Sequence, residues 1–163
     1  MFYAILARFL ALPWVFRFLL WQAKKTPYLH ILSPDGADVY MWRWWLFNPY
    51  DPETRAVRWA WLPSIRIHHI KRPDGDRHLH DHPWDARTFV LRGWYWETRQ
   101  EFPWLRLNGA GQTAEIPHNC FHRITSISPD GVYTLFVTGK PRHEWGFLVD
   151  GKKVPFREYL KTR

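Results

Sequence analysis

The segment "RHLHDHPWDARTFVLRG", from Arg77 to Gly93, places His78, His80 and His82 at alternate positions. In an extended strand, alternate residues point to the same face of the sheet, so these imidazoles would share one side. Imidazoles gathered in this way either form a polar face turned to water or bind one transition-metal ion. A metal site would need a further ligand from another part of the chain.

The segment "GAGQTAEIPHNCFHRITS" offers that ligand. His122 stands there at the start of an apolar run that is typical of a strand. Asn119, three residues earlier, tolerates the left-handed backbone conformation of a tight turn. A third imidazole from a second strand would therefore be able to meet the first two.

The first of these segments resembles the first motif of the cupins, G-x5-H-x-H-x3,4-E-x6-G. The same spacing occurs here: His80-x-His82 is followed by three residues, then position 86, then six residues, then Gly93. Two positions differ from the motif. Asp74 occupies the place of the first glycine, and Ala86 occupies the place of the glutamate ligand.

The second segment resembles the second cupin motif, G-x5-P-x-G-x2-H-x3-N. The matching positions are Gly111, Pro117, Asn119, His122 and Ser126, with two substitutions. Residues 94–110 separate the two motifs. The whole chain is also similar to a group of small cupin-like proteins from phage and prophage genomes. These proteins share an "HDHPW" core and a C-terminal stretch like "EWGFLVDGKKVPFREYL".

The resemblance implies that His80, His82 and His122 are metal ligands inside a small β-barrel. Because alanine cannot bind a metal, three readings follow from Ala86. The site holds its metal with three histidines, as in cupins that resemble cysteine dioxygenase and diketone-cleaving enzymes, which contain Fe(II). Alternatively, Asp85 supplies a carboxylate, or the barrel binds no metal. We expect a divalent transition metal and rank Fe(II) first, with zinc, nickel or manganese as alternatives.

Four more residues are expected to line the pocket or support the ligands: His78, Cys120, Trp84 and Thr88. The first three also have a simpler interpretation. His78 would lie at the rim or the surface, Cys120 would be a small buried apolar residue, and Trp84 would fill the core. Asp85 would equally serve as the cap of the turn after the Pro-Trp pair.

Beyond these segments, short aromatic and β-branched runs alternate with turn signals. The signals are "SPDG" at Ser33–Gly36 and Ser128–Gly131, and "RPDG" at Arg72–Gly75. Proline followed by Asp-Gly is typical of tight connections between strands. We therefore predict one mainly β domain over residues 27–163, an antiparallel cupin-like barrel or jelly roll.

The first residues, "MFYAILARFLALPWVFRFLLW", are almost wholly apolar. Two arginines and a proline make this segment a poor membrane-spanning helix. We predict that residues 1–26 form a hydrophobic helix packed on the barrel. The alternative is peripheral membrane contact through residues 1–21, helped by Lys24 and Lys25.

The charge and cysteine content limit the functional classes. The net charge is +8 with one cysteine, so no internal disulfide forms and a reducing, cytoplasmic location is expected, with membrane association as the alternative. Basic residues are scattered and match no nucleic-acid-binding motif, so nucleic acid is disfavoured as a partner. We expect a small-molecule ligand and a homodimer built through the sheets.

Two functions remain in competition. The first is a metal-dependent dioxygenase that acts on a small anionic molecule, for which Arg66, Arg87 and Arg123 are candidate clamps. The second is a non-catalytic barrel that binds a ligand or another protein, with a structural metal or none.

Overall fold

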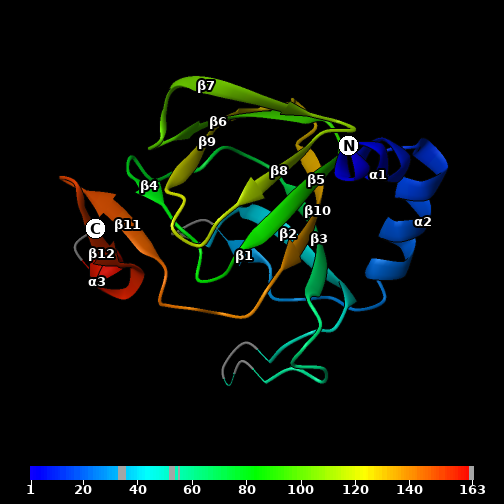
Figure 1. The fold of residues 1–163 in the computed structure, drawn as a ribbon, viewed down its shortest axis with the longest axis horizontal. Helices are drawn as coiled ribbons and strands as arrows, with labels where there is room; N and C mark the ends of the chain where they lie inside the picture. Colours follow the sequence, from blue (N-terminus) through cyan, green and yellow to red (C-terminus); the bar gives the residue numbers. More distant parts are fainter. Residues whose placement is uncertain (33–35, 52–53, 55, 162–163) are drawn as a thin grey trace.

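The computed structural model describes residues 1–32, 36–51, 54 and 56–161. Two six-stranded antiparallel sheets form the body of the molecule (Figure 1). The first sheet has the order β1 (Ile31–Leu32), β2 (Val39–Phe47), β3 (Ser64–Ile70), β10 (Val132–Thr138), β5 (Ala86–Arg92) and β8 (Thr113–Ile116). The second has the order β12 (Lys152–Pro155), β11 (Gly146–Val149), β4 (Leu79–His80), β9 (His122–Ile127), β6 (Trp94–Arg99) and β7 (Phe102–Gly109).

The two sheets face each other across an apolar core. Val90 and Val132 of the first sheet pack with Tyr95 and Ile124 of the second, and all four side chains are buried. These residues alternate with neighbours that point to the opposite side, as the period of a strand requires. The predicted mainly β fold is therefore confirmed. The first three residues of the predicted turn at Ser33–Gly36 lie outside the described residues.

The N-terminal segment departs from the prediction of one helix. It forms two helices, α1 (Phe2–Leu10) and α2 (Pro13–Ala23), whose axes differ by 77°. Pro13 occupies the first turn of α2, where its missing N–H costs nothing. It also forces Leu12 into an extended conformation, with ψ of 134°, and this ends the preceding helix. No single helix among the described residues is long and apolar enough to cross a membrane.

Both helices cover the outer face of the first sheet. Ala7 of α1 and Phe16 of α2 are buried in one apolar cluster with Phe89 and Leu91 of β5. At the other side of the molecule, β11 and β12 form one edge of the second sheet, and α3 (Phe156–Lys161) lies beside them (Figure 1). The predicted boundary between the helical segment and the barrel, at residue 26, stays a prediction.

Candidate metal centre

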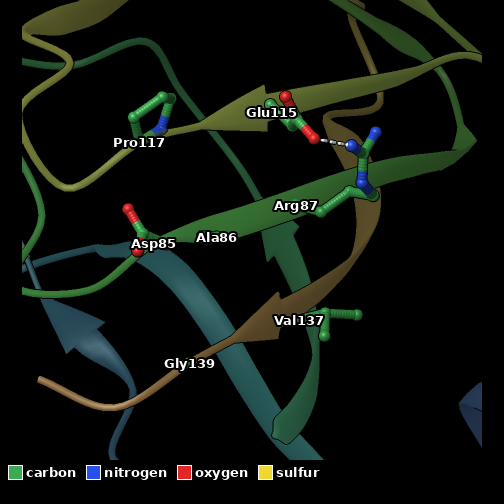
Figure 2. A pocket seen from close by; sticks show the side chains of 7 residues that line it. All are labelled: Asp85, Ala86, Arg87, Glu115, Pro117, Val137 and Gly139. Atoms are coloured by element: carbon green, nitrogen blue, oxygen red, sulfur yellow. Dashed lines mark hydrogen bonds and ion pairs between the residues drawn. The ribbon is translucent and has the colours of Figure 1, made fainter.

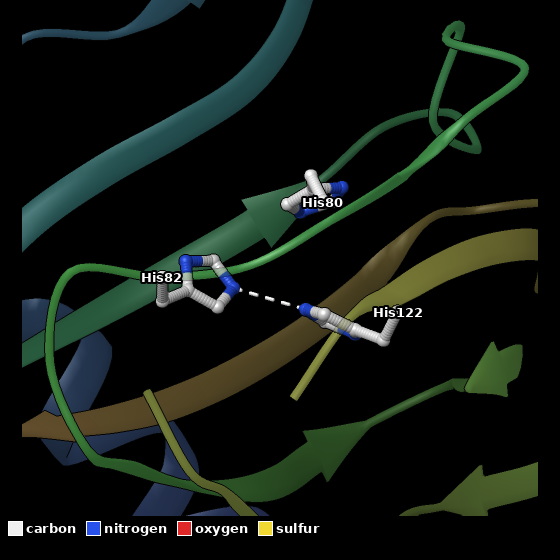
Figure 3. A group of neighbouring side chains, drawn as sticks. All are labelled: His80, His82 and His122. Atoms are coloured by element: carbon white, nitrogen blue, oxygen red, sulfur yellow. Dashed lines mark hydrogen bonds between the residues drawn. The ribbon is translucent and has the colours of Figure 1, made fainter. Parts of the chain in front are cut away.

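The structure brings His80, His82 and His122 together between the sheets. His80 is paired with His122 across strands β4 and β9, and His82 follows β4 by two residues. One ring nitrogen of each histidine lies within 4.8 Å of the others. Figure 3 shows the shortest approach, in which Nε2 of His82 lies 3.0 Å from Nε2 of His122.

This spacing fits a metal ion. Two imidazole nitrogens bound about 2.1 Å from one ion, at about a right angle, would lie about 3 Å apart. The His82–His122 pair already has this separation. The ring of His80 approaches from β4, with its centroid 4.9 Å from that of His122.

The protonation states of two of these histidines favour ligation. Burial lowers the pKa of His80 to about 4, although the nearby Asp74 carboxylate opposes the shift. Burial also holds the pKa of His82 well below its usual value, and the neighbouring His122, His80 and Arg66 add to this effect. Both rings are therefore neutral at pH 7, and a neutral imidazole has the lone pair that a metal requires.

Glu97 lies behind His122. The carboxylate is fully buried on β6, and its Oε2 lies 3.4 Å from Nδ1 of His122. Neither of these two atoms has a hydrogen-bond partner among the described residues. Burial acts to raise the pKa of Glu97, but His122 and Arg99 overcome it and the pKa is lowered. An ionised carboxylate at Nδ1 would fix the ring so that Nε2 faces the metal.

Asp74 has a similar place beside His80. Its Oδ2 accepts a hydrogen bond of 2.7 Å from the backbone N–H of Ile124, and lies 3.9 Å from Nδ1 of His80. Its other oxygen accepts a hydrogen bond from the hydroxyl of Tyr40. Asp74, which stands at the position of the first motif glycine, thus contacts residues of β2, β9 and β4.

Asp85 lies apart from the three imidazoles. Its Oδ1 accepts hydrogen bonds from the backbone N–H and from Nδ1 of His118, at 3.0 and 2.8 Å. Its Oδ2 pairs with Arg142 at 2.9 Å. The His118 hydrogen bonds, with Arg142, lower the pKa of Asp85. The structure therefore places Asp85 as a turn-stabilising residue, and the described cluster contains three histidines and no carboxylate.

Two of the expected pocket residues lie beside the cluster or its strand. Trp84 contacts His82 edge to face, with ring centroids 5.4 Å apart. His78 is half-buried, and its Nδ1 lies 2.9 Å from the hydroxyl of Tyr159 in α3. This contact ties the C-terminal helix to the strand that carries His80.

The other two expected pocket residues are part of the core. Cys120 is buried with Ala86, Ile116 and Phe136, and this burial raises the pKa of its thiol. Thr88 is buried on β5, between residues of the apolar core. The methyl group of Ala86 fills the place where the cupin motif has a glutamate, so this part of the interior is apolar.

The three candidate arginines have different surroundings. Arg87 pairs with Glu115 on the outer face of the sheet, and Arg123 donates to two backbone carbonyls. Arg66 is buried on β3, with its guanidinium 5.3 Å from the centroid of the Trp84 ring. Its charge contributes to the lowered pKa of His82. Arg66 is therefore the arginine of the three that shares the barrel interior with the cluster.

One pocket lies away from the histidine cluster. It has a volume of about 380 Å³ and is lined by Asp85, Arg87, Glu115 and Val137 among others, with no member of the histidine cluster. Figure 2 shows Arg87 of β5 and Glu115 of β8, two of its lining residues, joined as an ion pair. Another pocket, of about 240 Å³, lies beside the Ser128–Gly131 turn.

Sequence reasoning did not single out Glu97. The signal was present in "WYWETR", where Glu97 shares its parity with the apolar Tyr95 and so is expected on the inner face. An acidic residue on the inner face of a strand is costly unless it is paired, and such residues often support a site.

The fold is similar to solved cupin structures. The sequence itself matches no protein-family model, and no curated protein is similar to it at a significant level. A DMSP lyase, DddQ from Ruegeria pomeroyi DSS-3, has a TM-score of 0.52 at 15% identity, and the match covers 82% of this chain and 61% of the lyase. A cupin-2 domain protein from Rhodospirillum rubrum has a TM-score of 0.51 at 13% identity, covering 82% and 78%.

A third neighbour is the Fe(II) form of HppE, with a TM-score of 0.50 at 15% identity, covering 68% of this chain and 54% of HppE. At these identities the likeness concerns the fold, and the longer neighbours contain much that this chain does not match. The two-sheet topology of the chain agrees with its likeness to these neighbours. The chain has the cupin fold, a two-sheet jelly roll with a helical N-terminal segment.

Proposed function

We propose that the protein binds one divalent transition metal through His80, His82 and His122 and acts as an oxygenase on a small anionic molecule. The observation that carries the proposal is the convergence of three imidazole nitrogens between the sheets. We rank Fe(II) first, and the Fe(II) form of HppE supports this choice. When bound by three imidazoles, such an ion supplies redox and Lewis-acid chemistry at its remaining positions.

The chain itself would orient the ligands. Glu97 would accept the Nδ1 proton of His122, and Asp74 would steady His80 from the side of β9. Such outer carboxylates fix the tautomer and make the imidazole a better donor. The contacts of Glu97 with Arg99 and His122 also explain why an acidic side chain is tolerated in this fully buried position.

Arg66 would attract the anionic group of the substrate. It is a buried cation in the interior next to His82, and guanidinium is well suited to bind carboxylate or phosphate. Nε2 of His68 and Nε1 of Trp84 are also buried without hydrogen-bond partners among the described residues. Buried polar atoms of this kind usually bind water or a polar ligand. The aromatic walls would keep bulk water away from the reacting group.

A second candidate is a non-catalytic barrel with a structural metal. The observation in its favour is that Ala86 stands at the place of the motif's glutamate ligand, and the described cluster holds three histidines without a carboxylate. In this case the three histidines would still bind a metal, but the protein would bind a ligand or a partner without turning it over.

Metal binding is tested first. Protein stripped with a chelator is titrated without oxygen with Fe(II), Mn(II), Ni(II) and Zn(II), and bound metal is counted. We expect close to one ion per chain, lost when His80→Ala and His82→Ala are combined. A His118→Ala variant, which removes a histidine outside the cluster, is the control. Equal metal content in both variants would contradict the site.

Catalysis is tested on the Fe(II)-loaded protein. Oxygen uptake is measured with panels of small thiols and diketones that carry a carboxylate or phosphate. The proposed oxygenase consumes oxygen with at least one of them, and Arg66→Met raises the KM for the anionic substrate more than for an uncharged analogue. Stoichiometric metal without oxygen uptake would favour the non-catalytic barrel.

A further inference from the structure

The outer face of α2 carries three large aromatic side chains in the open. Trp14, Phe18 and Trp21 recur at the spacing of one helical face, and are 65%, 55% and 58% exposed. The rings of Phe18 and Trp21 lie in contact, with centroids 6.0 Å apart. Isolated exposed apolar residues are ordinary, but a continuous aromatic row on one helix indicates a binding surface.

The row continues onto α1 despite the bend between the helices. Phe9 contacts Trp14 edge to face, with ring centroids 5.9 Å apart. Ile5 and Phe2, one and two turns earlier on α1, are also exposed. We call this surface, made of Phe2, Ile5, Phe9, Trp14, Phe18 and Trp21, the aromatic face.

The charges that the helical segment itself carries have one sign, and Glu115 of β8, near α1, is paired with Arg87. Residues 1–34 contain Arg8, Arg17, Lys24 and Lys25 and no aspartate or glutamate. Arg8 and Arg17 are exposed on the two helices themselves. The ammonium group of Lys25 lies 3.4 Å from the centre of the Trp21 ring, so the aromatic row and the basic residues form one surface. Aromatic rings bordered by basic side chains match the interface of an anionic bilayer, where the rings reach the acyl boundary and the cations meet the headgroups.

The opposite sides of the two helices pack against the first sheet. Ala7, Phe16 and Ala23 are buried against the first sheet, so the helices cannot leave the domain without uncovering its core. A helix of 11 residues, such as α2, is about 16 Å long and does not cross a hydrocarbon core of about 30 Å. The geometry therefore suits a segment that lies on a membrane rather than one that spans it.

We propose that the aromatic face of α1 and α2 docks the protein on the surface of an anionic lipid bilayer. The inference is independent of the metal centre. In Figure 1 the two helices and strand β4, which carries His80, lie on opposite sides of the molecule. A docked protein would therefore keep its histidine cluster turned away from the lipid.

The test is sedimentation of the full chain with vesicles. One set of vesicles is pure phosphatidylcholine, and the other contains phosphatidylglycerol as well. We expect binding to the anionic vesicles, weakened by high salt because the basic residues contribute through screened attraction. The combined variant Trp14→Ser, Phe18→Ser and Trp21→Ser should bind at least about ten-fold more weakly, since it removes three inserted rings. Its control, Trp104→Ser with Leu105→Ser, changes exposed apolar residues on β7 and should bind as the unaltered protein does.

Charge is tested separately with Arg17→Glu and Lys24→Glu, which should weaken binding to anionic vesicles and leave the melting temperature unchanged. Several outcomes would overturn the proposal. One is that the unaltered protein stays in the supernatant with anionic vesicles. Another is that both serine variants bind equally well. If ultracentrifugation shows that the aromatic variant turns a dimer into a monomer while vesicle binding is unaffected, the face is an interface between two copies.

Discussion

At the scale of single residues, the buried carboxylate of Glu97 explains how His122 is held. Its Oε1 accepts a hydrogen bond of 2.7 Å from Nε of Arg99, and its Oε2 faces Nδ1 of His122. One carboxylate oxygen of Glu97 therefore pairs with the guanidinium of Arg99, and the other faces the imidazole of His122. The arrangement links the charge balance of the interior to the orientation of a proposed metal ligand.

We expect Glu97→Gln to weaken metal binding by about 10- to 100-fold, the usual effect of removing an outer partner of a ligating histidine. Because the substitution also breaks the pair with Arg99, the matched control is Arg99→Gln. This control breaks the same pair but keeps the carboxylate behind His122. Metal affinity is measured by competition with a chromophoric chelator. If both variants lose affinity equally, Glu97 acts through folding alone.

The lowered pKa of His80 predicts a pH dependence of stability in the metal-free protein. The unfolded chain takes up this proton near pH 6.5, whereas the folded chain does so near pH 4. Between these values the unfolded state binds more protons, so the unfolding free energy falls as the pH is lowered through this window. The effect of His80 is on the order of 3 kcal/mol, and the lowered pKa of His82 acts in the same direction.

Urea unfolding of chelator-stripped protein at pH 7 and at pH 5 measures this effect. A His80→Gln variant, which has no titratable ring, should show a smaller loss of stability between the two pH values. An unchanged unfolding free energy in the unaltered protein would show that His80 titrates normally in the fold.

At the scale of elements, the Ser128–Gly131 turn controls how β9 and β10 meet. Gly131 has a φ of 80°, and the hydroxyl of Ser128 donates a hydrogen bond of 2.6 Å to the carbonyl of Gly131. A Cβ at Gly131 would lie 2.5 Å from the carbonyl oxygen of Ile70 on β3. The turn predicted from "SPDG" thus also sets the close approach of a third strand.

Gly131→Ala should therefore destabilise the protein by more than the strain of its left-handed backbone. Gly151 provides the matched control, since it has a φ of 76° but open space around the added Cβ. Gly151→Ala should cost about 1 kcal/mol, the strain alone, and Gly131→Ala at least about 2 kcal/mol. Denaturant unfolding of both variants gives the comparison. Equal losses would mean that the neighbouring strand adjusts without cost.

At the scale of the whole molecule, the two N-terminal helices complete a core that the sheets alone leave open. Ile67, Phe89 and Leu135 on the outer face of the first sheet are covered by α1 and α2. Without the helices, this face would expose apolar side chains over several strands. The same helices present the aromatic face to the outside, so one segment has both a structural side and a proposed docking side.

Two phenylalanines on α2 lie on opposite sides of the helix, so their substitutions test the two sides separately. Phe16 is buried against the sheet, whereas Phe18 is more than half exposed. Phe16→Ala should lower the unfolding free energy by about 3 kcal/mol, since it leaves a cavity in a packed core. Phe18→Ala should change it by less than about 0.5 kcal/mol. Thermal and urea unfolding give both values. A large loss with Phe18→Ala would indicate that the aromatic face is covered in the native protein.

The mainly β fold and the three histidines that meet could be predicted from the sequence. The alternation of His80 and His82 is a local property of an extended chain, and the two motif spacings pointed to His122. The Pro-Asp-Gly signal at Ser128–Gly131 was equally local, because proline and glycine restrict or free individual backbone angles. These features need no knowledge of which strands become neighbours.

The surroundings of the histidines could not be predicted in the same way, because they depend on contacts between distant parts of the chain. Strand pairing sets Arg99 opposite His122, and this register brings Glu97 to the imidazole. The tertiary structure also turns Asp85 toward His118 and Arg142. It sets Arg66 beside Trp84, which contacts His82, while Arg87 pairs with Glu115. Local periodicity shows which face a side chain takes, but the partner across the sheet depends on pairing between residues distant in sequence, which a single sequence does not encode locally.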